Sequence, residues 1–317
     1  MSRQALRYDG LWWRQFAYLG CVYGPEWWKR YSPPVIGAII FALVRRNRNA
    51  AIIHMERILG DVGRRRAWLG ALQMFANFAH CFTETMEFYG PLPRPVRIDP
   101  PTEDPLAAAM AAGRGAVVLT AHFGNWDIAA KTLCGYGRPI SIVMAREANV
   151  TTAEYLREAR ERAGVRVIYS DTSVFASLNM IRALRQNEIV ALQLDRVVGK
   201  TRSIPLFGVN ANFPAGPFVL ARVAGAPLIP VFIPRLGIRH YAIRLGHPLI
   251  VPRERSDLQA IDQAMRTVLT EFEDLVREFP TQWFQFSQFW PAPGDRHESL
   301  EADGMERERE PVRRRKA

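Results

Sequence analysis

The sequence predicts an α/β fold in which a mixed, largely parallel central sheet is flanked by helices. From about residue 105 onward, short apolar runs with strand character alternate with segments of helical periodicity. The first 95 residues lack this alternation and carry apolar and aromatic residues at helical spacing. The segment after Pro293 is charged and poor in core residues. We therefore expect a helical region over 1–95, an α/β domain over 96–292 and a disordered tail over 293–317.

The α/β region can be divided into its expected elements. A breaker cluster, Gly90–Pro95, separates it from the N-terminal helices. The expected strands are Ala116–Ala121, Ile140–Ala145, Val165–Tyr169, Ile189–Leu194, Leu228–Ile233 and Tyr241–Leu245. The expected helices are Leu106–Ala112, Ala153–Ala163, Val174–Gln186, Ala215–Ala224 and a long closing helix capped by Ser256.

Composition narrows the class of protein. A chain of 317 residues with 48% hydrophobic residues can bury a sizeable core. Its three cysteines are widely spaced, so the sequence predicts neither a disulfide framework nor a metal site and favours a reducing compartment. The formal charge of +11 points to acidic partners, namely nucleic acid, anionic lipid headgroups, phosphorylated substrates or an acidic protein.

The N-terminal region has the features of a membrane-associating segment. Its apolar run, Val35–Val44, follows Pro33-Pro34 and would form a helix of about 15 Å, half of a hydrocarbon core of about 30 Å. We therefore expect it to lie on an anionic membrane surface without spanning it. Tryptophans and cations typical of the headgroup region surround the run: Trp12, Trp13, Trp27 and Trp28 with Arg14, Lys29 and Arg30. The alternative is that these tryptophans pack on the main domain.

The segment from His122 to Asp127 carries the clearest chemical signal. His122 follows the expected strand Ala116–Ala121, so it lies at the carboxyl end of a strand, where open α/β sheets bind ligands. Gly124 permits a tight turn, and Asn125 can cap a helix that brings Asp127 back toward the imidazole. An imidazole paired with a carboxylate can deprotonate a hydroxyl. The alternative is a histidine packed beside an aspartate at a helix start.

The order of short motifs along the chain resembles a known family. Gly113-Arg114-Gly115, an apolar strand and His-Phe-Gly-Asn-Trp-Asp resemble the bacterial late acyltransferases of lipid A, which add lauroyl or myristoyl groups, and the related phosphatidylinositol mannoside acyltransferases. Both belong to the lysophospholipid acyltransferase group with its His-x4-Asp/Glu box. The likeness runs from about residue 10 to 292. Its further blocks are Arg160 with Gly164, Leu194-Asp195-Arg196, Pro205–Gly208, Phe213–Pro217, Ala226–Pro230 and Pro280 with Gln282 and Trp283.

Three departures from the family pattern are visible. Asp127 stands where many lipid A enzymes carry glutamate, which leans toward the phosphatidylinositol mannoside branch. The N-terminal spanning helix of the family is reduced to the ten-residue run, and the Glu-Gly-Thr-Arg block of glycerol-phosphate acyltransferases is absent from the sequence. The resemblance therefore supports the reaction better than any particular acceptor.

The resemblance implies an O-acyltransferase at the cytoplasmic face of the inner membrane. His122 would deprotonate a hydroxyl of a membrane lipid or glycolipid, such as a lipid A precursor, and Asp127 would orient His122. The donor would be an acyl thioester of acyl-carrier protein or coenzyme A, with no metal or redox cofactor. The residues expected to bind substrate or stabilise the oxyanion are Asn125, Arg146, Arg160, Asp195 and Gly216, together with the backbone at Gly124.

Two other classes of function account for parts of the sequence. A nucleic-acid-binding protein would suit the basic charge, but the sequence has no recognisable reader motif and its aromatics cluster with apolar runs. We therefore expect no nucleic-acid partner. An acyltransferase-like membrane protein with a scaffold or binding role would keep the fold and lack catalysis. The intact His122–Asp127 pair argues against this second alternative.

Overall fold

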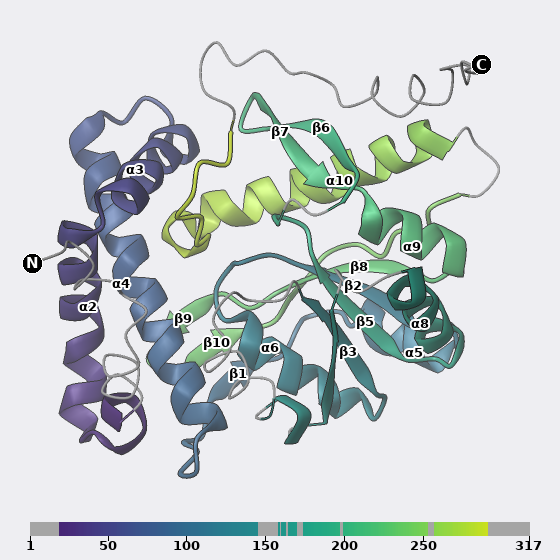
Figure 1. Ribbon diagram of the computed structural model, residues 1–317, viewed down its shortest axis with the longest axis horizontal. Helices are drawn as coiled ribbons and strands as arrows, with labels where there is room; N and C mark the ends of the chain where they lie inside the picture. Colours follow the sequence, from purple (N-terminus) through teal and green to yellow (C-terminus); the bar gives the residue numbers. More distant parts are fainter. Residues whose placement is uncertain are drawn as a thin grey trace, which may run out of the picture.

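A computed structural model describes residues 19–144, 158, 160–162, 164–169, 174–196, 199–252 and 257–290 (Figure 1). Its centre is a six-stranded sheet of order β11-β8-β2-β5-β3-β4. The strands from β8 to β4 run parallel, and β11 is antiparallel to β8, which confirms the mixed, largely parallel sheet. The strands are β2 (Ala116–Thr120), β3 (Ile140–Met144), β4 (Val165–Tyr169), β5 (Ile189–Gln193), β8 (Leu228–Phe232) and β11 (Arg244–Leu245).

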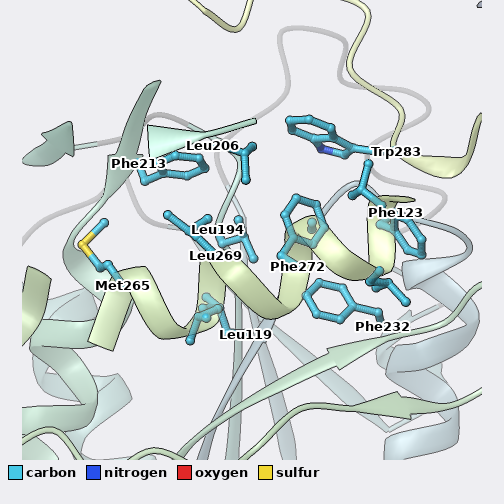
Figure 2. Close-up of a cluster of buried hydrophobic side chains, with 14 of the residues drawn as sticks. Leu119, Phe123, Leu194, Leu206, Phe213, Phe232, Met265, Leu269, Phe272 and Trp283 are labelled. Atoms are coloured by element: carbon cyan, nitrogen blue, oxygen red, sulfur yellow. The ribbon is translucent and has the colours of Figure 1, made fainter. Parts of the chain in front are cut away.

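Helices cover both faces of this sheet. Successive side chains of a strand point to opposite faces, so Val117 and Leu119 of β2 belong to one buried cluster, and Ala116 and Val118 belong to another. The first cluster is covered by α8, α9 and α10, with Phe272 of α10 among its aromatics (Figure 2). The second is covered by α5 and α6. These helices are α5 (Pro105–Ala111), α6 (Trp126–Leu133), α8 (Val174–Arg185), α9 (Gly216–Ala224) and α10 (Asp257–Glu278).

Smaller elements complete the α/β part. A three-stranded sheet has the order β1-β10-β9, and an antiparallel hairpin of β6 and β7 packs on α10. The expected strand Tyr241–Leu245 is divided between this small sheet and the central one, because β10 pairs with β1 and β11 pairs with β8. The bounds are β1 (Arg97–Asp99), β6 (Thr201–Leu206), β7 (Val209–Pro214), β9 (Arg235–Gly237), β10 (His240–Ala242), η1 (Cys134–Tyr136) and η2 (Pro280–Gln282).

The N-terminal region is helical, as predicted, and stands beside the sheet (Figure 1). It comprises α2 (Glu26–Leu43), α3 (Arg45–Leu59) and α4 (Arg64–Tyr89). Phe41, Met55 and Phe75 from these helices belong to the same buried cluster as Leu119 and Trp283. The expected boundary near residue 95 therefore crosses a continuous core.

Helix α2 corrects two expectations about the N-terminal region. It extends over 18 residues, about 27 Å, because it continues through Pro33 and Pro34 instead of starting after them. Prolines remove helical hydrogen bonds, so packing must keep this part of α2 helical. The buried residues of α2 pack closely on α4: a Cβ added at Gly37 would lie 2.8 Å from the Phe75 carbonyl oxygen. Lys29 is buried in an ion pair of 2.9 Å with Glu87 and does not face lipid headgroups.

Within the described ranges, no helix combines the length and the apolar character that crossing a bilayer requires. Several expectations fall outside these ranges. Trp12, Trp13, Arg14, the cap at Ser256 and the tail over 293–317 are not described, and only a few residues of the helix expected over 153–163 are.

Candidate active site

Two neighbouring parallel strands bring His122 and Asp195 together. Strand β2 ends at Thr120 and β5 ends at Gln193, and these two residues are paired in the sheet. The Leu194 amide then donates to the Thr120 carbonyl at 2.8 Å, which carries the pairing one step beyond the strands. The residues two positions after each strand, His122 and Asp195, therefore face each other at the carboxyl edge of the sheet. This edge is where ligands of open α/β sheets bind.

The imidazole of His122 is held by the Asp195 carboxylate. His122 Nδ1 lies 3.0 Å from Asp195 Oδ1, and the His122 backbone amide donates to Oδ2 at 2.9 Å. An ionised carboxylate only accepts hydrogen bonds, so in the neutral imidazole Nδ1 carries the proton and Nε2 keeps its lone pair. The Asp195 side chain is fully buried, whereas 21% of the His122 side chain is exposed. The basic nitrogen can therefore be reached from solvent while its partner cannot.

Two side chains of the closing segment complete the surroundings of Asp195. Trp283 Nε1 donates to Oδ2 at 2.9 Å, and Gln285 Nε2 donates to Oδ2 and to the Asp195 carbonyl, each at 3.2 Å. Burial favours a raised carboxyl pKa, but the imidazole charge and these hydrogen bonds hold the pKa of Asp195 below its usual range. Burial likewise favours a lowered imidazole pKa, but Asp195 outweighs it and raises the pKa of His122.

The structure corrects the expected partner of His122. Asp127 lies in the first turn of α6, and its Oδ1 accepts from Arg160 Nε at 3.0 Å and from Arg160 Nη2 at 2.5 Å. The helix that begins at Trp126 turns the Asp127 carboxylate toward Arg160, and Asp195 takes the place at the imidazole. Arg160 is 5% exposed, so it forms a buried ion pair, whereas the sequence predicted an accessible substrate-binding group.

Asn125 and Gly124 shape the turn and are not free to bind substrate. Asn125 caps α6 through the Ile128 amide, as predicted, but it is buried and its side chain also bonds to Thr85, Cys81 and Tyr241. The Gly124 amide donates to the Gln282 carbonyl at 2.9 Å, so it cannot serve an oxyanion as expected. Gly124 has φ +57°, and a Cβ there would lie 2.0 Å from the Ile233 carbonyl oxygen, which leaves glycine as the residue that fits.

The remaining expected site residues are not joined to His122 by a described contact. Gly216 is the exposed first residue of α9, and among the contacts described for this part of the chain none links it to the imidazole. Arg146 lies outside the described residues. No group of three His, Cys, Asp or Glu side chains that could hold a metal ion occurs in the described ranges.

Apolar and aromatic groups surround the site. The Trp126 ring meets the His122 ring edge-on at 5.0 Å, and Phe284 follows at 6.2 Å from Trp126. An apolar cavity of about 50 Å³ lies between α6 and the sheet, next to the Asp127–Arg160 pair. Its lining comes from β2, β3, β5, β8 and α6.

Sequence reasoning missed the role of Asp195 and the participation of Gln285. The sequence predicted Asp195 as a substrate-binding residue and not as the partner of His122. The signal that identifies it is positional, since Asp195 follows its strand by the same two residues as His122. That signal becomes informative once β2 and β5 are known to be neighbours.

An imidazole held by a buried carboxylate at the carboxyl edge of a parallel sheet defines a general-base site on an α/β scaffold. The comparison with known families then assigns the chain: it belongs to the bacterial lipid A biosynthesis acyltransferase family, whose model matches residues 1–291. This confirms the family resemblance seen in the sequence.

Curated relatives share part of the chain. It is 29% identical over 191 residues to a phosphatidylinositol mannoside acyltransferase of Mycobacterium tuberculosis (strain ATCC 25618 / H37Rv). The matched residues cover 60% of this chain and 58% of that protein. It is 30% identical over 193 residues to a protein of the same name from Mycolicibacterium smegmatis (strain ATCC 700084 / mc(2)155), covering 60% and 61%. The matched part therefore spans about three fifths of the length of these relatives.

The pairing at the site can be tested by an NMR titration of the histidine Cε1 protons. We predict that His122 titrates above the ordinary value of about 6.5, and that Asp195→Asn lowers its pKa because the variant removes the negative charge at Nδ1. Asp127→Asn is the matched control and should lower it much less, because that carboxylate is paired with Arg160. A larger decrease in the Asp127 variant would restore Asp127 as the partner of the imidazole.

Proposed function

We propose that this protein is an O-acyltransferase that moves a fatty acyl group from a thioester to a hydroxyl of a membrane lipid. The observation that carries the proposal is the His122–Asp195 pair, which in the neutral imidazole leaves the Nε2 lone pair free, on a side chain within reach of solvent. Membership of the lipid A biosynthesis acyltransferase family supports the same reaction. A scaffold without catalysis would have no need to bury a carboxylate against an accessible imidazole.

The reaction follows from the roles of these two residues. His122 Nε2 takes the proton of the acceptor hydroxyl, and the resulting alkoxide oxygen attacks the thioester carbonyl. The tetrahedral intermediate then collapses, the carbon–sulfur bond breaks, and the thiolate leaves and takes the proton back from the imidazolium. Asp195 fixes the tautomer and stabilises the imidazolium that exists between the two proton transfers. A catalytic role for Asp127 stays a prediction, and its carboxylate, in the first turn of α6, accepts from Arg160 Nε at 3.0 Å.

The substrates are inferred at the level of chemical class. The donor is the thioester of acyl-carrier protein or coenzyme A, both acidic, and the net charge of +11 favours encounter with either. The thioester supplies the reactive carbonyl, so the reaction requires no metal or redox cofactor. The acceptor is a glycolipid hydroxyl, since the family is described by lipid A biosynthesis and the relatives by phosphatidylinositol mannoside. The apolar cavity beside α6 suits part of an acyl chain.

We further propose that α2 rests on the cytoplasmic face of the inner membrane. Its outer side exposes a set of large apolar residues that nothing in the described part of the chain covers, and we name this set the α2 face. The α2 face consists of Trp27, Tyr31, Val35, Ile36, Ile39, Ile40 and Leu43. Exposed apolar surface of this kind marks interaction sites.

Exposed cations adjoin the α2 face. Arg30 lies within it, and Arg45 and Arg46 follow its last residue. Trp68 of α4 is 43% exposed and its ring contacts Phe41 at 5.1 Å, which extends the apolar surface toward the exposed arginines at the start of α4. Apolar side chains flanked by arginines suit a bilayer surface with anionic headgroups.

The proposed activity predicts a lipid change in cells. Deletion of the gene should cause a lipid to accumulate that is lighter by one acyl chain than the corresponding lipid of wild-type cells. Mass spectrometry of the total lipid extract measures this change. Wild type should reverse this, and His122→Ala should not, since loss of a general base costs on the order of 10²–10⁴-fold in rate. His247→Ala is the matched control, because that histidine is 86% exposed and pairs with Glu271. Restoration by His122→Ala, or a lipid profile unchanged by the deletion, would contradict the proposal.

Membrane contact through α2 is testable by vesicle flotation with anionic and zwitterionic lipid. The double variant Val35→Glu/Ile39→Glu should lose most of its binding to anionic vesicles, because two charges would enter the apolar contact. Ile250→Glu/Leu258→Glu is the control, with side chains of similar exposure outside α2, and should float like wild type. Wild-type binding should weaken with salt, since each cation near the surface contributes about 1 kcal/mol that ions screen. Equal flotation of the two double variants would place the contact elsewhere.

A further inference from the structure

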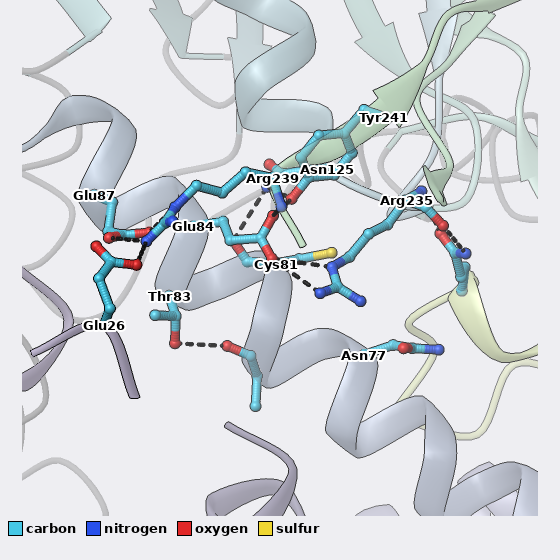
Figure 3. Close-up of polar contacts among 12 residues, drawn as sticks. Glu26, Asn77, Cys81, Thr83, Glu84, Glu87, Asn125, Arg235, Arg239 and Tyr241 are labelled. Carbon is cyan, nitrogen blue, oxygen red and sulfur yellow. Dashed lines mark hydrogen bonds and ion pairs between the residues drawn. The ribbon is translucent and has the colours of Figure 1, made fainter. Parts of the chain in front are cut away.

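A buried polar cluster supports the turn from His122 to Asp127 on the side facing α4 (Figure 3). Its centre is the hydroxyl of Tyr241, a fully buried residue of β10. That hydroxyl donates to Glu84 Oε2 of α4 at 2.5 Å and accepts from Asn125 Nδ2 of the turn at 3.1 Å. The three groups thus form a chain from α4, through β10, to the residue that caps α6. None of them contacts the His122 imidazole in the described structure.

Burying the Glu84 carboxylate costs solvation free energy, and both of its oxygens accept hydrogen bonds in the structure. Oε1 accepts from Arg235 Nε at 3.1 Å and Nη2 at 3.0 Å, and Oε2 accepts from the Arg239 amide at 3.0 Å. Desolvation still raises the pKa of Glu84. Buried ion pairs are weak contributors to stability compared with apolar packing of similar volume. Their presence here is better explained by the geometry that they impose.

The backbone leading to Tyr241 is irregular in two places. Arg239 has φ +52°, a left-handed conformation that costs an L-residue about 1–2 kcal/mol. The pairing of β10 with β9 also shifts register between His240 and Tyr241, and bulges of this kind re-aim a side chain. Both features lie directly before the residue whose hydroxyl meets Glu84 and Asn125. Local strain of this type is typical of positions where the geometry matters for function.

The cluster continues from α4 to α2. Arg239 donates to both oxygens of Glu87, at 2.9 and 2.8 Å, and Lys29 of α2 pairs with Glu87 at 2.9 Å. Glu87 therefore ties the hairpin that carries Tyr241 to the helix that bears the α2 face. A continuous set of buried and partly buried polar contacts joins α2, α4 and β10 to the turn.

We propose that Glu84 and Tyr241 are positioning residues for acyl transfer, which hold the His122–Asp127 turn in place through Asn125. This inference rests on the proposed function. Displacing a catalytic group by about 1 Å can cost on the order of 10²-fold in rate, so a rigid support behind the turn affects turnover without touching substrate. We expect the support to act on kcat, since both residues are buried and neither contacts the His122 imidazole.

Tyr241→Phe tests the proposal, because it keeps the buried ring and removes the one hydroxyl that joins Glu84 to Asn125. Thr83→Val is the matched control: it removes a buried hydroxyl on the same helix α4, bonded to the Ala79 carbonyl and to Cys21. Both variants should lower Tm by a similar amount, about 2–4 °C. Tyr241→Phe should also lower kcat on the order of 10-fold with KM within about twofold of wild type. Thr83→Val should leave both kinetic constants within about twofold.

A second readout is independent of any assay for activity. NMR titration of His122 should give a lower pKa in Tyr241→Phe, because a displaced turn weakens the contact of the imidazole with Asp195. Thr83→Val should leave that pKa unchanged. Equal kcat in the two variants, or an unchanged His122 pKa in Tyr241→Phe, would overturn the positioning role. If the wild type showed no acyl transfer, the proposed function would fail, and the titration would still decide whether Tyr241 holds the turn.

Discussion

The Asp195 carboxylate is the group on which the site depends. Burying a charge is costly unless it is paired and hydrogen-bonded, and Asp195 meets this condition with donors from three residues in two segments. These are the imidazole and amide of His122 after β2, the Trp283 indole and the Gln285 amide. The contacts that hold the His122 imidazole therefore also fasten the closing segment to the edge of the sheet. Removing the carboxylate would disturb chemistry and packing together, whereas Asp127 is committed to Arg160.

The helical region has two sides with different tasks. Its inner side shares the core of the sheet and, through Glu84 and Glu87, reaches the turn that carries His122. Its outer side exposes the α2 face, which we assign to the membrane. A lipid hydroxyl stays at the bilayer surface, so an enzyme that acts on it benefits when one helix layer connects that surface to the catalytic turn.

The sequence was sufficient to predict the largely parallel sheet, because apolar runs with strand character alternate with helical segments. It also placed His122 at a strand end, where β2 indeed stops at Thr120. It could not predict the partner of His122, because the adjacency of β2 and β5 is a property of strand order, which local patterns do not encode. Lys29 was misassigned for a similar reason, since its buried partner Glu87 lies 58 positions along the chain. Helix α2 runs through Pro33 because packing on α4 overrides local propensity.

The most direct test of the account is whether His122 and Asp195 act as one unit in acyl transfer. Turnover by His122→Ala, Asp195→Asn and the double variant would be measured with an acyl thioester donor and total membrane lipid. When two residues act as one unit, removing either of them removes their shared contribution to the rate. The double variant should therefore be no slower than His122→Ala. Losses that multiply in the double variant would show that Asp195 contributes independently of His122 and would contradict the central claim.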